Sequence, residues 1–214
     1  MKRMLSKQEF HCDHRHNGFE HPLCYQRFAR SEPQKVGYFD IETSNLRPDF
    51  GWVISWCIKH QGENKFEEYI LNEQDYKGNT RDRLSIQKLV VALGKFDKVV
   101  TYYGTKFDNK FVRTRALIHH LQFIPNNTIQ HLDLYYCVKS RLLLSRSRLA
   151  NVGGALGLPM QKTPIEPEIW NTVGLTYDRK ALEYIREHNR KDTIVLEQAH
   201  KVLQPYISEG RKWF

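Results

Sequence analysis

Apolar segments in the middle of the chain predict the strands of a β-sheet. Residues 36–42 are mostly apolar and predict a buried strand. Gly62 and Asn64 provide turn chemistry between two further β-rich segments, which therefore predict a hairpin. In total the pattern predicts five strands, at residues 36–42, 52–60, 66–71, 97–103 and 128–132.

Apolar residues at helical spacing predict helices between and after these strands. Ile86, Leu89, Val90 and Leu93, for example, recur at the spacing of one helix face. The predicted helical segments are residues 80–93, 107–121, 133–144 and 178–203, with a glycine-rich loop and helix at 149–158. This order predicts an α/β fold with a mixed five-stranded sheet and flanking helices, in which three strands form a meander and two arrive by crossovers.

Two carboxylates lie at the end of the first predicted strand. Asp40 and Glu42 are two residues apart, so their side chains point to the same face. Two like charges at the end of a buried strand repel each other unless a cation lies between them. A divalent metal suits this role, and carboxylate oxygens favour Mg²⁺ or Mn²⁺. The spacing alone, however, favours two solvated acids at a strand tip.

Composition places the chain among globular proteins with an anionic partner. It has 214 residues, 40% hydrophobic and 27% charged, enough for one α/β core and a small appendage. The net charge of +9 favours nucleic acid, and an acidic membrane surface second. No apolar run approaches the ~20 residues of a membrane span, and no secretory signal follows the basic start, so we expect an intracellular protein. Four cysteines at this length predict no disulfide framework, and Cys57 and Cys137 read as small core residues.

The N-terminal extension, residues 1–34, is rich in cysteine and histidine. It has too few apolar residues to bury a core, and a tetrahedral zinc site would supply the missing stability. The proposed ligands are Cys12, His16, His21 and Cys24, with His14 as the alternative to His16. The competing interpretation is a histidine-rich surface segment with two incidental thiols. Residues 35–214 form the main domain.

Further acids follow later strands and helices. Asp108 lies at the start of a helix after the fourth strand and the turn at Gly104. Ligands of open α/β sheets bind at the carboxyl ends of strands, where Asp108 is expected. His188 and Asp192 are four residues apart and share one helix face. Asp133 precedes a helix, and we interpret it as an N-cap rather than a ligand.

Together these motifs resemble the DEDD, or DnaQ-like, 3′–5′ exonuclease superfamily, which has the ribonuclease-H-like fold. The resemblance rests on Asp40-x-Glu42, on a Gly-x-x-Phe-Asp element that ends at Asp108, and on the last helix. The final motif, residues 188–192, is similar to the Tyr-Asn-Arg-x-Asp of one branch of predicted exonucleases, with His188 in place of the tyrosine. The resemblance covers about residues 36–205.

The resemblance implies roles for five residues. Asp40, Glu42, Asp108 and Asp192 would hold two Mg²⁺ or Mn²⁺ ions, with Asp40 bridging both. His188 would accept a proton from the attacking water or orient it. A helix-face histidine without a role is the competing interpretation, and Tyr184, one turn earlier, is a fallback for the base.

Basic and aromatic residues around these acids predict contacts with a polymer. Lysines and arginines near phosphate set affinity without sequence preference, and an aromatic ring can stack on a terminal base. The predicted nucleic-acid contacts are Lys106, Phe107, Arg113, Lys139, Arg141, Arg146, Arg148 and Arg190. The competing interpretations are a solvated charged face for 139–148 and a core position for Phe107.

The sequence therefore predicts a two-metal exonuclease acting on single-stranded nucleic-acid ends, with DNA favoured over RNA. Two other classes stay open. One is a structure-specific endonuclease or a ribonuclease of the same fold. The other is a non-catalytic, zinc-containing nucleic-acid-binding protein, which retention of all four acids argues against, because carboxylates repel phosphate.

Overall fold

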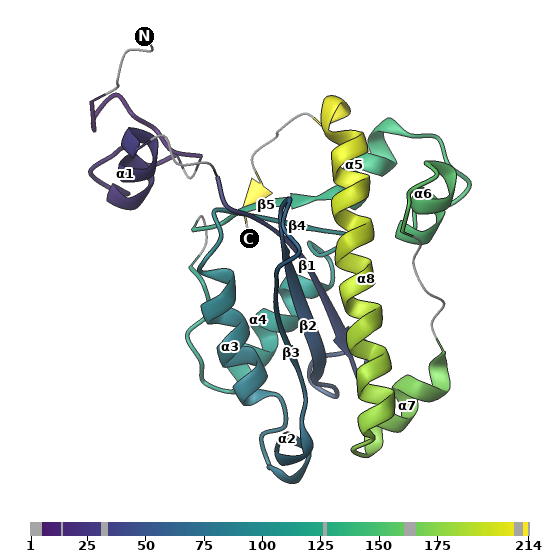
Figure 1. Cartoon of the computed structure of the whole chain (residues 1–214). Helices are drawn as coiled ribbons and strands as arrows, with labels where there is room; N and C mark the ends of the chain where they lie inside the picture. The colour runs from purple at the N-terminus through teal and green to yellow at the C-terminus, as the bar shows by residue number, and fades with distance from the viewer. Residues whose placement is uncertain are drawn as a thin grey trace.

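The structure is a computed structural model that describes residues 6–13, 15–30, 34–125, 128–160, 166–207 and 212–213. A single mixed sheet forms its centre, with strand order β3-β2-β1-β4-β5-β6 (Figure 1). The strands are β1 (Val36–Thr43), β2 (Val53–His60), β3 (Phe66–Ile70), β4 (Lys98–Thr101), β5 (Gln130–Asp133) and β6 (Lys212–Trp213). All five predicted strands are present. The additional β6 has two residues, too few to show any alternation in the sequence.

The central strand β1 pairs with one antiparallel and one parallel neighbour. It runs antiparallel to β2 and parallel to β4, and β4 runs parallel to β5. The β1–β2–β3 meander and the two crossovers are those that the sequence predicts. The carboxyl ends of β1 and β4 therefore lie at the same edge of the sheet, together with the segments that follow them.

Helices cover both faces of the sheet (Figure 1). On one face, α3 (Arg83–Leu93) and α4 (Asp108–Ile118) contribute to a buried cluster that includes Phe39 and Ile41 of β1. On the other, α5 (Leu134–Arg141), α6 (Leu149–Ala155) and α8 (Arg179–Leu203) pack on Val36 and Tyr38 of β1. Because side chains alternate along a strand, Asp40 and Glu42 continue the row that faces α8.

A bulge interrupts the β1–β2 ladder beside these acids. Glu42 pairs with Ser55 and Thr43 with Val53, so Ile54 is the extra residue on β2. Ile54 is buried in a separate cluster with Val173 and residues of α8. The bulge thus anchors the first half of α8 against the end of the sheet.

Three helices were not predicted: α1 (Pro22–Arg30), α2 (Glu73–Lys77) and α7 (Pro167–Leu175). With five residues, α2 is too short for a periodic pattern, and the capping box of Asn72 and Asp75 defines it. By contrast, α8 forms one continuous helix of 25 residues, capped by Asp178. Among the described residues, no helix combines the length and the apolar character needed to cross a membrane.

Candidate active site

A ladder of polar contacts between β2 and α8 sets the position of the long helix. Every second residue of β2 meets every fourth residue of α8. The two repeats match, since two strand residues span about 6.6 Å and four helical residues about 6.0 Å. The contacting pairs are Ser55 with Asn189, Cys57 with Thr193, and Lys59 with Glu197. This ladder holds α8 so that the adjacent residues His188 and Asp192 face β1.

His188 and Asp192 of α8 meet Glu42 of β1. The Nε2 atom of His188 lies 3.6 Å from Glu42 Oε1 and 3.6 Å from Asp192 Oδ2. One ligand atom from each of the three residues lies within 4.8 Å of the others. His188 and Asp192 are 2% and 1% exposed, so this group is closed to bulk water on the helix side. The structure thus brings together three of the five predicted site residues directly.

Asp40 is fixed by a residue that the sequence analysis did not single out. Asn189 Nδ2 donates a hydrogen bond to Asp40 Oδ2 at 2.7 Å. The amide oxygen of Asn189 accepts a hydrogen bond from Ser55 Oγ at 3.1 Å. Asn189 is fully buried, so both bonds are protected from water. They hold the Asp40 carboxylate on the same side of β1 as Glu42.

Asp108 reaches the same strand from α4. Its Oδ1 atom accepts a hydrogen bond from the backbone N–H of Ile41 at 3.2 Å, and the residue is 4% exposed. Since Ile41 lies between Asp40 and Glu42, this bond places the carboxylate of Asp108 beside the strand that carries the other two acids. All four predicted acids therefore converge on the carboxyl end of β1.

Trp170 of the unpredicted helix α7 closes one side of the group. Its indole Nε1 donates a hydrogen bond to Glu42 Oε2 at 3.1 Å. Its ring packs edge-on against His188, with 5.2 Å between the ring centroids. Both contacts restrict the rotamers of the site residues. Helical spacing does place Ile169 and Val173 on one side of α7, and proline is common at a helix start, but nine residues are too few to show a clear period.

The donor set fits divalent cations. Glu42, His188 and Asp192 meet directly, and the carboxylates of Asp40 and Asp108 are held along the same strand end. Like charges gathered in this way disfavour one another without a counter-ion. Carboxylate oxygens are the ligands that Mg²⁺ and Mn²⁺ prefer, and Mg²⁺ keeps several waters, so four carboxylates can hold two ions. The residues present therefore suit the metal that the sequence predicted.

Comparison with known proteins is consistent with this geometry. A family model described as RNase_H superfamily matches residues 37–204. The chain belongs to this superfamily. Among solved structures, a family B DNA polymerase from the hyperthermophilic archaeon Pyrobaculum calidifontis superposes with a TM-score of 0.64 at 19% identity. The match covers 81% of this chain but only 25% of the polymerase chain, and at this identity it shows the fold. No curated protein sequence matches.

Within this RNase_H superfamily domain, Asp133 is the N-cap of α5, as predicted, and it also binds the turn that follows β4. Its carboxylate accepts hydrogen bonds from the backbone N–H of Tyr135, Tyr103 and Thr105, at 3.1, 2.8 and 2.9 Å. Tyr103 has a φ of 69°, which bulky residues rarely adopt. Asp133 therefore holds a strained turn at the carboxyl end of β4, a location where strain often serves function.

An aromatic cluster that the sequence analysis missed surrounds this turn. Tyr103 is 45% exposed, and its ring lies 4.8 Å from that of Tyr135 in an edge-on contact. Tyr135 also contacts Tyr136 at 5.3 Å, and Lys139 Nζ lies 5.9 Å from the Tyr135 ring. The two Tyr-Tyr pairs, one before Gly104 and one after Asp133, were the available signal.

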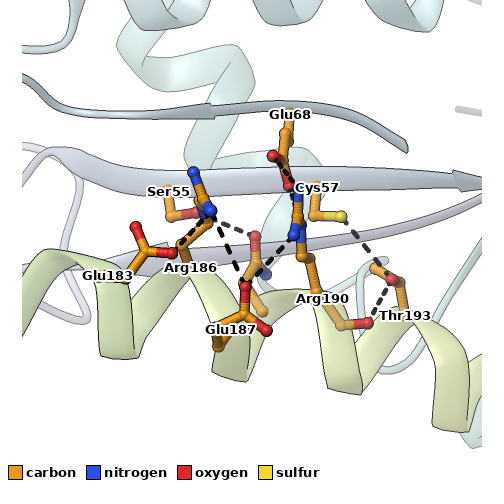
Figure 2. Close-up of polar contacts among 9 residues, drawn as sticks. Ser55, Cys57, Glu68, Glu183, Arg186, Glu187, Arg190 and Thr193 are labelled. Carbon is orange, nitrogen blue, oxygen red and sulfur yellow. Dashed lines mark hydrogen bonds and ion pairs between the residues drawn. The ribbon is translucent and has the colours of Figure 1, made fainter. Parts of the chain in front are cut away.

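Arg190, one of the predicted nucleic-acid contacts, is held by acids of the domain itself. Its guanidinium donates to both oxygens of Glu68 on β3, at 2.5 and 2.6 Å, and to Glu187 at 3.2 Å (Figure 2). The hydrogen bond with Glu68 raises the pKa of Arg190 above its ordinary value. An arginine held by two carboxylates links α8 to β3, which favours a structural role for Arg190.

The other predicted contacts divide into exposed and packed residues. Lys106, Lys139, Arg141, Arg146 and Arg148 are exposed. In contrast, Phe107 packs on the core cluster beside Phe111, which favours its core role, and Arg113 is half-buried with its guanidinium 5.6 Å from the ring of Phe123.

The proposed zinc ligands are only partly brought together. Cys12, His16 and His21 offer ligand atoms within 4.8 Å of one another. Cys24 lies in α1 and is not in this group, although it is half-buried. His14 lies outside the described residues.

Proposed function

We propose that the protein is a metal-dependent 3′–5′ exonuclease that hydrolyses phosphodiester bonds at single-stranded DNA ends. The observation that carries the proposal is the convergence of Asp40, Glu42, Asp108 and Asp192, with His188, on the carboxyl end of β1. Membership of the RNase_H superfamily supports a nuclease of this fold. The 3′–5′ polarity rests on the resemblance of the motifs to the DEDD superfamily.

Each acid has a defined task. Glu42 and Asp192 would hold one divalent ion, Asp40 would bridge two ions, and Asp108 would support the second. When bound, such a pair of ions stabilises the charge on the attacking and leaving oxygens of the phosphodiester. Asn189 and Trp170 keep the carboxylates of Asp40 and Glu42 in place, so that little reorganisation accompanies the reaction.

His188 accepts the proton of the attacking water at Nε2. That atom faces Glu42 and Asp192, and packing on Trp170 fixes the plane of the ring. A neutral imidazole in this position can take a proton from a water molecule. Tyr184 is a weaker candidate, because its hydroxyl donates a hydrogen bond to Glu166 at 3.0 Å.

The strand end also offers a surface for the DNA. Tyr102 OH, at the end of β4, donates a hydrogen bond to the backbone oxygen of Ser147 at 2.6 Å, which ties the loop with Arg146 and Arg148 to the carboxyl edge of the sheet. Those arginines would bind phosphates, and the exposed ring of Tyr103 would stack on a base. Neither contact selects a sequence.

The experiment compares substrates that differ only in their ends. A 5′-labelled linear strand, the same strand with uncleavable 3′-terminal linkages, and a circular strand are incubated with Mn²⁺. We expect stepwise shortening of the unmodified strand alone. Cleavage of the circle would instead identify an endonuclease, and degradation of a matched RNA in preference to DNA would identify a ribonuclease. Binding of all substrates without hydrolysis would support a non-catalytic protein.

A further inference from the structure

The N-terminal extension folds into a hairpin followed by a helix. Residues 11 and 17 form an antiparallel bridge, and Cys12 N donates a hydrogen bond to His16 O at 3.0 Å. Arg15 adopts a φ of 63° in the turn between them. Cys12 and His16 therefore flank a tight turn, and His21 stands directly before α1.

We propose that this unit binds one structural zinc ion through Cys12, His16, His21 and Cys24. Zinc bonds of 2.0–2.3 Å in a tetrahedron place ligand atoms roughly 3.5 Å apart. Cys12 Sγ lies 3.6 Å from His21 Nδ1, and the His16 and His21 rings meet edge-on with 5.6 Å between centroids. The first three ligands thus stand at distances that need only small adjustment.

Cys24, in the first turn of α1, would supply the fourth ligand, although its sulfur is not within 4.8 Å of all the other three and must move toward them on binding. It follows His21 by three residues, and the hydrogen bond from Tyr25 N–H to His21 O, at 3.3 Å, keeps His21 at the start of the same helix. With two thiolates and two neutral imidazoles, the charge of Zn²⁺ is balanced. All four positions would come from the protein, so the ion would have no open position for catalysis.

The size of the local core explains why a metal is needed. Apart from the ligand residues, the described packing centres on three aromatic rings: Phe10 lies 5.5 Å from Tyr25 and 4.9 Å from Phe28, centroid to centroid. Such a small cluster does not stabilise a separate unit, and metal binding supplies folding free energy in units of this kind. The inference concerns the extension and is independent of the proposed nuclease activity.

Metal content of the full chain tests the proposal. The protein is purified without a histidine tag, supplied with Zn²⁺, dialysed, and analysed by mass spectrometry of the metal. We expect one zinc per chain in the wild type and in Cys137→Ser, and its loss in Cys12→Ser and Cys24→Ser. A zinc-free wild type, or stoichiometric zinc in Cys12→Ser, would overturn the site. Zinc kept by Cys24→Ser and lost by His14→Ala would overturn the ligand set.

Thiol titration gives a second readout that does not depend on variants at the site. In Cys137→Ser, three cysteines are left, and Cys57 is buried, which raises the pKa of its thiol to about 12 and keeps it unreactive. Adding a zinc chelator should therefore expose two reactive thiols. No change in thiol count on chelation would contradict a zinc site.

Discussion

The side chain of Asn189 holds the carboxylate of Asp40, with 2.7 Å between its Nδ2 and the Oδ2 of the acid. Asn189 is itself held by Ser55 and is shielded from water. A ligand that is oriented in advance binds a metal more tightly than one that must be ordered on binding. The adjacent residues His188 and Asn189 thus contact different acids of β1, Glu42 and Asp40 respectively.

Replacing Asn189 with alanine should lower activity without unfolding the domain. The loss of a residue that orients a metal ligand typically costs 10–100-fold in metal affinity or activity. We expect a loss in this range, partly recovered at high Mn²⁺ concentration. Thr193→Ala is the matched control, because Thr193 is buried on the same helix but contacts Cys57 rather than an acid. An equal loss in both variants would contradict a specific role of Asn189.

His188→Gln should reduce kcat by about 100-fold or more, because glutamine cannot accept the proton of the water. KM should change little, since the residue acts on the reacting water and not on the DNA. His200→Gln is the control, as His200 is a buried histidine of the same helix that contacts Tyr38. Steady-state kinetics on a labelled strand measure both constants. A kcat close to that of the wild type would remove His188 from the mechanism.

Arg190→Ala should change stability rather than DNA binding. The paired guanidinium and carboxylate are partly exposed, so we expect a loss of roughly 1 kcal/mol in the free energy of unfolding. Chemical denaturation of Arg190→Ala, Glu68→Ala and the double variant would measure their coupling. Additive effects, together with a large loss of DNA affinity in Arg190→Ala, would instead support the predicted nucleic-acid contact.

Much of the site follows from local sequence rules. Alternation along β1 places Asp40 and Glu42 on one face, and a four-residue separation places His188 beside Asp192. The helix start after β4 brings Asp108 to the same sheet edge. The first two rules depend only on neighbours in sequence, and the third needs only the predicted order of strands and helices.

The missed features of the site depend on contacts between distant segments. Trp170 reaches Glu42 across 128 residues, and no periodicity within α7 encodes that hydrogen bond. Tyr103 adopts its rare conformation because Asp133, 30 residues later, holds the turn. Arg190 is predicted to contact nucleic acid because it lies close to Asp192 in the sequence. Its partner Glu68 lies on a strand 122 residues away, which the sequence does not reveal.

Replacing Arg146 and Arg148 together by alanine should weaken binding of single-stranded DNA. If each arginine neutralises one phosphate, the slope of log affinity against log salt should fall by about 1.4, at about 0.7 per contact. Fluorescence anisotropy at several salt concentrations measures this slope. Lys201→Ala is the control, an exposed cation near the end of α8. An unchanged slope would make the 146–148 loop a solvated face.

The central claim is that the acids at the end of β1 form a hydrolytic metal site. The most direct test is Mn²⁺-dependent turnover of a 5′-labelled single strand by Asp40→Asn and Asp192→Asn, with DNA affinity measured in parallel. Asparagine at position 40 can still accept the hydrogen bond of Asn189, so the fold should persist. Asp97→Asn serves as the control, since Asp97 contacts Lys35 at the amino end of β4. We predict that both site variants bind DNA but lose hydrolysis, while Asp97→Asn remains active. Near-normal turnover by Asp40→Asn would contradict the account.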